Sequence, residues 1–212
     1  MSDEGFEHLK DLTKMKRMVV CSSKITGSGF KHLAGMKQLE SINLHSSPAS
    51  DTGLEAIGKL KSLRRLEIVH TNVTDEGLKH VGNLVNLRQL HVASHFTTED
   101  ALPFLRRFDE LEQLDVYEKA ASNATCAKIG WLPKLRFLML IGGTFDDDGV
   151  KEIARATTLE ELTLNSAKVT DASIDSIAKL TRLRKLNLGG TKITPEGKAK
   201  LAKLLPKATI TP

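Results

Sequence analysis

Hydrophobic and polar residues alternate in short segments that recur at a fixed interval along the chain. The pattern L-x-x-L-x-L, in which Met, Ile or Val can replace Leu, recurs every 24 residues, and a shortened copy follows at 205–210. The full copies begin at Met15, Leu39, Leu63, Leu87, Leu111, Leu135, Leu159 and Leu183. Because alternation of apolar and polar residues is typical of a half-buried strand, the sequence predicts eight or nine short strands in register.

A second pattern fills the intervals between these strands. It reads TNVTDEGLKHVGNL at 71–84, SAKVTDASIDSIAKL at 166–180 and TKITPEGKAKLAKL at 191–204. A Thr followed by an acidic residue is typical of a helix start, as is Pro195 at a first helical position. The apolar residues that follow lie three or four apart, which forms one helical face. One strand and one short helix cannot bury their apolar sides alone, so the units must stack into a solenoid.

These patterns resemble the leucine-rich repeat family, in the T-D-x-G-L form found in bacterial repeats and in the cysteine-containing repeats of F-box proteins. The resemblance covers essentially all of residues 1–212 as one domain, with a starting helix at 1–12, eight repeats at 13–204 and a closing strand at 205–212. It implies an α/β horseshoe with a parallel concave sheet of eight to nine strands and short convex helices. It also implies a role in binding other proteins.

The sequence departs from the family's commonest form at the turn after each strand, where Asn is usual. This position reads Ser23, Ser47, Thr71, His95, Lys119, Gly143, Ala167 and Thr191. A continuous asparagine ladder is therefore not expected, although short hydroxyl side chains could bond to the turn backbone in some copies.

The register predicts which side chains leave the core. Successive residues of a strand point to opposite faces, so in the segment FLMLI, 137–141, Leu138 and Leu140 should be buried. Phe137, Met139 and Ile141 should then project from the concave face, with Tyr117 beside Ile141 on the neighbouring strand. We call Tyr117, Phe137, Met139 and Ile141 the apolar island. Its expected polar border consists of His91, Gln113, Asp115, Glu118, Glu161, Thr163 and Asn165.

An aromatic and methionine-containing patch with a polar rim resembles the centre of a protein–protein interface. The leading interpretation is a non-enzymatic scaffold that captures an unidentified protein. The island supplies the anchors, and His91, Asp115, Glu118 and Glu161 fix the partner's orientation. The alternative is that a loop of the irregular neighbouring repeat, 117–131, covers the island, because this repeat lacks the D-x-G-L motif.

The charge distribution suggests other classes of partner. The net charge is +5, but residues 175–212 hold nine Lys or Arg and two Asp or Glu, a balance of +7. The remainder holds 31 − 9 = 22 basic and 26 − 2 = 24 acidic residues, a balance of −2. The basic C-terminal end could therefore bind an acidic partner or nucleic acid. Nucleic acid is disfavoured because the concave positions mix both signs. A further alternative is the substrate-recognition part of a larger F-box-like or effector protein, which requires an additional segment.

Two histidine arrangements bear on catalysis and on metal binding. His91 beside Asp115 is the nearest approach to a catalytic dyad, but no Ser or Cys lies in register with it, so no enzyme and no cofactor are predicted. His45, His70 and His95 lie 25 residues apart and run diagonally across three strand ends. No carboxylate or thiolate completes a zinc site, and His95 is expected to point inward, so hydrogen bonds to turn backbone are expected instead.

The remaining features bear on location and assembly. Cys21 and Cys126 belong to distant repeats, so both are expected to be reduced. No window approaches the ~20 apolar residues of a membrane span and no signal peptide is recognised, which predicts a cytoplasmic protein without a membrane partner.

The first strand leaves an open sheet edge, yet a monomer is favoured over an edge-paired dimer. Trp131 is expected to pack over the irregular repeat or to extend a binding surface.

Overall fold

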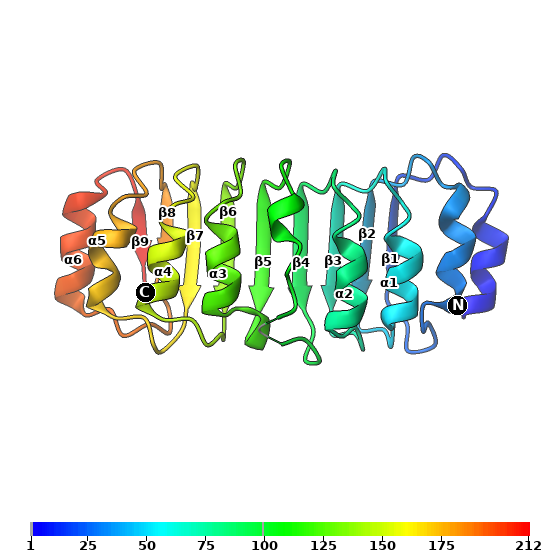
Figure 1. Ribbon diagram of the computed structural model, residues 1–212, viewed down its shortest axis with the longest axis horizontal. Coiled ribbons are helices and arrows are strands. Elements are labelled where there is room, and N and C mark those ends of the chain that lie inside the picture. The colour runs from blue at the N-terminus through cyan, green and yellow to red at the C-terminus, as the bar shows by residue number, and fades with distance from the viewer. Residues whose placement is uncertain (1, 99) are drawn as a thin grey trace.

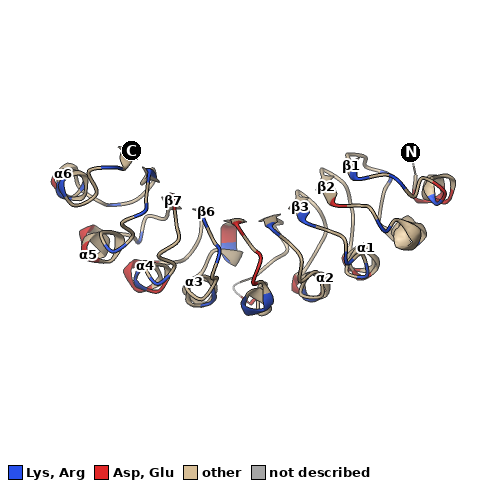
Figure 2. Cartoon of the chain, turned by 90° about the horizontal axis from the view of Figure 1, so that it is seen from above, with Lys and Arg blue, Asp and Glu red and all other residues tan. Residues whose placement is uncertain are grey.

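A computed structural model describes residues 2–98 and 100–212. Within these residues nine strands form one parallel sheet in the order of the sequence. They line the inner side of an arc whose outer side carries the helices (Figures 1 and 2). The strands are β1 (Arg17–Val20), β2 (Ser41–His45), β3 (Arg65–Val69), β4 (Gln89–Ala93), β5 (Gln113–Tyr117), β6 (Phe137–Ile141), β7 (Glu161–Asn165), β8 (Lys185–Asn187) and β9 (Thr209–Thr211). The predicted parallel horseshoe is confirmed.

The outer side consists of short α-helices and 3-10 helices. The α-helices are α1 (Asp51–Ile57), α2 (Asp75–Val81), α3 (Asn123–Ile129), α4 (Asp147–Ile153), α5 (Ile174–Ile177) and α6 (Pro195–Leu204). The 3-10 helices are η1 (Asp3–Leu9), η2 (Ser28–Gly35), η3 (Leu105–Arg107), η4 (Glu118–Ala120) and η5 (Asp171–Ser173). Isolated helices of this length are unstable in water, so packing of the stacked repeats must hold them.

The core is a continuous stack of leucines. Strand pairing keeps residues 24 apart side by side, as in Leu66 with Leu90 and Leu114 with Leu138. The first leucine of each strand motif from Leu39 to Leu183 is at most 1% exposed. Since burial of one leucine contributes about 1.5–3 kcal/mol, each repeat gains its stability largely from its neighbours.

Hydrogen bonds between repeats also tie the helix starts together. The carboxylate of Asp147 in α4 accepts the Thr170 backbone N–H at 2.8 Å and the Thr170 hydroxyl at 2.7 Å. Thr170 in turn caps the next helix, as its hydroxyl accepts the Ala172 N–H. The same acid-to-threonine clamp joins Asp3 to Thr26, Asp51 to Thr74, Asp75 to Thr98 and Asp171 to Thr194. The predicted threonine caps are confirmed. Each clamping acid lies in the first turn of one helix and binds the threonine before the helix of the next repeat, 23 residues later.

The turns after the strands differ from the sequence expectation in four repeats, where Ser23, His95, Lys119 and Ala167 are exposed. Ser94 and Ser166, one position earlier than predicted, occupy the buried site, while His95 and Ala167 are exposed. The Ser94 hydroxyl donates to the carbonyl oxygens of Thr71 and Val73, and Ser166 donates to that of Phe145. A small hydroxyl side chain fits beneath the stacked turns and an imidazole does not, so the prediction that His95 points inward was wrong.

Candidate functional site

The structure places the apolar island on the concave face. Strand β6 pairs with β5 so that Phe137 lies beside Gln113, Met139 beside Asp115 and Ile141 beside Tyr117. The alternate residues Leu138 and Leu140 are 3% and 0% exposed, whereas the four island residues are half-buried. The predicted register is therefore confirmed, and the island lies outside the core.

Contacts between neighbouring strands order one half of the island. The Tyr117 hydroxyl donates to the Met139 sulfur at 3.1 Å. The Tyr117 ring stacks on the His91 ring, with centroids 5.0 Å apart and planes inclined by 15°. Partial burial, reinforced by the negative charge of Asp115, raises the pKa of Tyr117 above its ordinary value. The tyrosine is thus a neutral, oriented hydrogen-bond donor at the edge of the island.

An arginine covers part of the other half. The Arg136 guanidinium lies 5.1 Å from the centroid of the Phe137 ring. It also makes two hydrogen bonds of 2.9 Å to the Glu160 carboxylate, which restrict its position. On the concave face itself, the Glu161 carboxylate accepts a 2.9 Å bond from the Lys185 ammonium. Phe137 is consequently bordered by ion pairs of the protein's own side chains.

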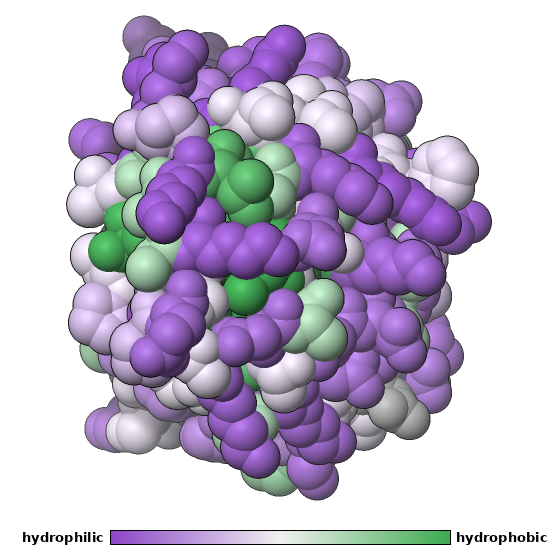
Figure 3. All heavy atoms as spheres, turned by 90° about the vertical axis from the view of Figure 1, so that its left-hand side faces the viewer, coloured by the Kyte–Doolittle hydropathy of each residue, from purple (hydrophilic) through white to green (hydrophobic). Residues whose placement is uncertain are grey.

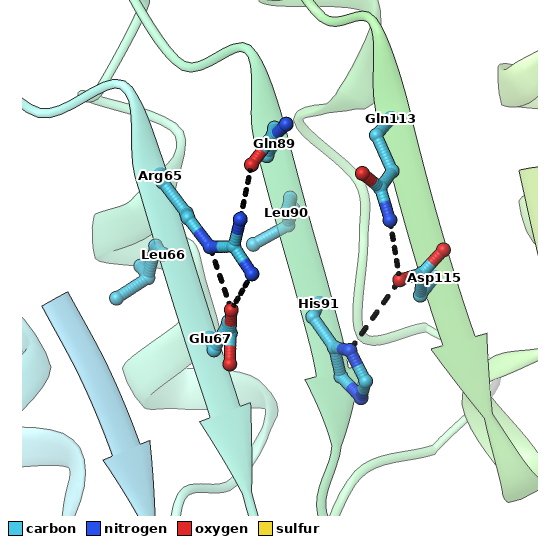
Figure 4. A pocket seen from close by; sticks show the side chains of 8 residues that line it. All are labelled: Arg65, Leu66, Glu67, Gln89, Leu90, His91, Gln113 and Asp115. Atoms are coloured by element: carbon cyan, nitrogen blue, oxygen red, sulfur yellow. Dashed lines mark hydrogen bonds and ion pairs between the residues drawn. The ribbon is translucent and has the colours of Figure 1, made fainter. Parts of the chain in front are cut away.

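A polar hollow adjoins the island across β3, β4 and β5 (Figure 4). Asp115, only 9% exposed, accepts a 2.9 Å bond from the Gln113 amide and lies 3.4 Å from His91 Nδ1. The Arg65 guanidinium contacts Glu67 and also bonds to Gln89 at 2.8 Å. The hollow is lined by Arg65, Leu66, Glu67, Gln89, Leu90, His91, Gln113 and Asp115. None of these residues is a Ser, Thr, Cys or Lys nucleophile.

Glu118 lies at the end of β5 in a strained backbone conformation, with φ of 56°. Its carboxylate points to the neighbouring turn, where it lies 2.7 Å from His95 Nδ1. His95 stacks on His70 at 5.5 Å, and His70 meets His45 edge-on at 5.8 Å. The His70 ring therefore contacts the rings of both other histidines, and among the described residues no hydrogen bond joins these three imidazoles to turn backbone. Among the described residues no group of three or more His, Cys, Asp or Glu is placed to hold a metal ion.

Other candidate residues lie apart from the island. Cys21 is exposed and Cys126 is buried, and both are free thiols. Burial raises the pKa of the Cys126 thiol far above its ordinary value. Trp131 is 59% exposed, with the Arg106 and Arg155 guanidinium groups each 5.7 Å from its ring. Val19 on the β1 edge is 72% exposed.

Comparisons with known proteins agree with this geometry. A family model described as Leucine Rich repeat matches residues 59–81 and 179–202. The structure is similar to an internalin (inlF) from Listeria monocytogenes, with a TM-score of 0.65 and 18% identity over 96% of this chain and 69% of that chain. The fold is a leucine-rich repeat solenoid.

Two further solved structures share this fold. Internalin C2 from Listeria monocytogenes aligns with a TM-score of 0.60 and 17% identity, over 92% of this chain and 78% of that one. The complex of TLR13 with ssRNA13 aligns with a TM-score of 0.53 and 17% identity, over 94% of this chain and 36% of TLR13. No curated protein sequence matches the chain. In the part of the chain that the structure describes, no helix is long and apolar enough to span a membrane.

Proposed function

We propose that this leucine-rich repeat protein is a non-enzymatic scaffold that binds another protein through the apolar island. The observation that carries the proposal is the half-buried run of Phe137, Met139 and Ile141 on the concave face, on a strand whose neighbours present mainly polar side chains. Interfaces are anchored by a few central apolar and aromatic residues with a polar rim. The island has this composition and lies on the middle strands of the concave face.

The order of the island favours binding over a merely tolerated apolar surface. The hydrogen bond of the Tyr117 hydroxyl and the stacking of its ring on His91 hold this anchor in place. Binding of a partner therefore costs little additional side-chain entropy at Tyr117. His91, Asp115 and Glu161 border the island, and we assign them the role of orienting the partner. Glu118 is assigned the same role at the strand end, in concert with His95.

Charge on the concave strands favours a protein over nucleic acid as the occupant of this face. The basic residues Arg17, Arg65 and Lys185 are matched by the acidic residues Glu67, Asp115 and Glu161. A phosphate backbone is held mainly by unmatched Lys and Arg, and its affinity depends on their number. Although the TLR13 structure contains single-stranded RNA, the concave strands of the present chain lack such an excess.

Affinity capture from native lysate tests the proposal. Wild-type protein should retain a partner that the double variant Phe137→Ser/Met139→Ser fails to retain. Val19→Ser is the matched control, because Val19 is an exposed apolar residue of the same concave face on the distant strand β1. Equal retention by wild type and the double variant would show that the island is not the binding surface.

A further inference from the structure

The loops along one edge of the solenoid carry the excess positive charge. Because all strands are parallel, every loop that leads from a helix to the next strand lies at the same edge, the upper one in Figure 1. These loops hold 15 Lys or Arg and 6 Asp or Glu, so their net charge is 15 − 6 = +9. They are residues 10–16, 36–40, 58–64, 82–88, 108–112, 130–136, 154–160, 178–184 and 205–208. We call this the basic edge.

The opposite edge has no such excess. The connections at this edge lead from each strand to the following helix, and the connection from β5 to α3 includes η4. They are residues 21–27, 46–50, 70–74, 94–104, 118–122, 142–146, 166–170 and 188–194. Counted from the sequence, they hold 4 basic and 4 acidic residues, a balance of zero. The molecule is thus polarised from edge to edge, in addition to the basic C-terminal end that the sequence indicates. Figure 2 looks onto the basic edge, where Lys and Arg recur along the arc.

Ion pairs neutralise the middle of the basic edge. Glu110 pairs with Lys134 at 2.5 Å, Glu112 with Arg88 at 3.3 Å and Glu160 with Arg136 at 2.9 Å. Toward the two ends of the arc, exposed cations have no ion-pair partner among the described residues. They are Lys14, Lys16, Lys37, Lys61 and Arg64 near the N-terminus, and Lys179, Arg182, Arg184 and Lys207 near the C-terminus. A ligand of this edge must therefore reach two basic clusters separated by a neutral centre.

Exposed apolar side chains gather on the same edge. Among the described residues, six large apolar side chains are strongly exposed, and four of them belong to this edge or adjoin it: Leu12, Val85, Trp131 and Leu204. Leu12 lies in the N-terminal loop and Leu204 at the end of α6, so each basic cluster has an apolar neighbour. Figure 3 faces the C-terminal end of the solenoid, next to the basic edge, and shows hydrophobic surface on that end between hydrophilic side chains. Trp131 lies in the neutral centre between two arginines.

We propose that the basic edge docks on the surface of an anionic lipid bilayer. A bilayer is flat and extended, so it meets both basic clusters at once, and its headgroup region accepts apolar and tryptophan side chains among cations. A nucleic acid strand offers no apolar environment for the exposed side chains of Leu12, Val85 and Leu204. Its phosphates would also gain no unpaired cations at the centre of the edge, where ion pairs neutralise the basic residues. Docking by the edge leaves the concave island open, so this proposal is independent of the protein-binding function. It departs from the sequence expectation of no membrane partner, which rested on the lack of a spanning segment.

Vesicle co-flotation tests the proposal. Wild-type protein should float with phosphatidylcholine vesicles that contain phosphatidylserine and should not float with phosphatidylcholine alone. Each Lys or Arg near an anionic bilayer strengthens binding about fivefold, so Arg182→Gln/Arg184→Gln should weaken it about 25-fold. The matched control is Lys24→Gln/Lys168→Gln, which removes the same charge from exposed residues of the opposite edge and should bind like wild type.

Trp131 supplies a direct readout, because it is the only tryptophan in the chain. Its fluorescence emission should move to shorter wavelength on anionic vesicles, since the indole leaves water. Absence of binding at low salt, or an equal loss in the two double variants, would overturn the proposal. It would also be overturned if single-stranded RNA bound through Arg182 and Arg184 while anionic vesicles did not bind.

Discussion

The hydroxyl of Tyr117 lies 3.1 Å from the sulfur of Met139 on the neighbouring strand, on the concave side of the sheet. This contact requires both residues to point away from the leucine core, and it links the aromatic and thioether parts of the island. Half-buried apolar side chains are therefore ordered by one another before any partner arrives.

Replacement of island residues should cost less stability than replacement of one core residue. Phe137→Ser/Met139→Ser removes half-buried groups and should lower the free energy of unfolding by no more than about 2 kcal/mol. Leu138→Ala, between them in sequence but 3% exposed, should lower it by about 2–5 kcal/mol. Chemical denaturation measures both values. A double variant less stable than Leu138→Ala would place the island in the core.

The acid-to-threonine clamp should contribute measurably to stability. Asp147→Ala removes the acceptor of two hydrogen bonds from Thr170. The free energy of unfolding should therefore fall by about 1.5–3 kcal/mol. Asp148→Ala is the control, because Asp148 lies in the same first helical turn but its side chain makes no bond to the next repeat among the described residues. Equal effects of the two variants in thermal unfolding would mean that the helix dipole, and not the clamp, is responsible.

Tyr117 should ionise at unusually high pH. Burial and the negative charge of Asp115 raise the pKa of Tyr117 in the folded protein. The protonated tyrosine therefore contributes its full share to the free energy of unfolding below the ordinary tyrosine pKa. This contribution is lost as the pH rises through the pKa of the folded state. As the only tyrosine, Tyr117 can be followed by its ultraviolet absorbance. Asp115→Asn should lower the pKa of Tyr117, while Glu67→Gln, on the more distant strand β3, should leave it unchanged. An unshifted titration in Asp115→Asn would contradict the assigned arrangement.

The two thiols should differ in reactivity. Cys21 is exposed, whereas burial raises the pKa of Cys126 and shields its sulfur. A thiol-specific reagent should modify one cysteine per native molecule and both after denaturation. Cys21→Ser should leave no rapidly reacting thiol in the native protein. Rapid modification of Cys126 would show that its repeat opens readily.

Much of the fold follows from periodicity in the sequence. Repeats 24 residues long determine strand register, so the placement of Phe137, Met139 and Ile141 outside the core could be predicted and is confirmed by the strand pairing. The acids Asp51, Asp75, Asp147 and Asp171 recur at multiples of the same interval, so their clamp on the next repeat was visible in principle. The sequence pattern alone indicates only the effect of each acid on its own helix, because the contact with the next repeat depends on how the repeats stack.

Other features depend on geometry that spacing does not encode. The buried turn position is filled by Ser94 in place of His95, because the turn shifts by one residue to bury the smaller side chain. Stacking of His91 on Tyr117 requires side-chain angles that no pattern specifies. Likewise, the basic edge emerges only when loops that are far apart in sequence are aligned along one side of the sheet.

Site-specific photocrosslinking provides the most direct test of the island as a protein-binding surface. A photoreactive amino acid is introduced at Met139, on the concave face, and separately at Ala124, an exposed residue of helix α3. After irradiation in native lysate, we expect the residue at 139 to form a discrete covalent adduct with a partner protein, and the residue at 124 to form none. An adduct from position 124 without one from position 139 would contradict the account.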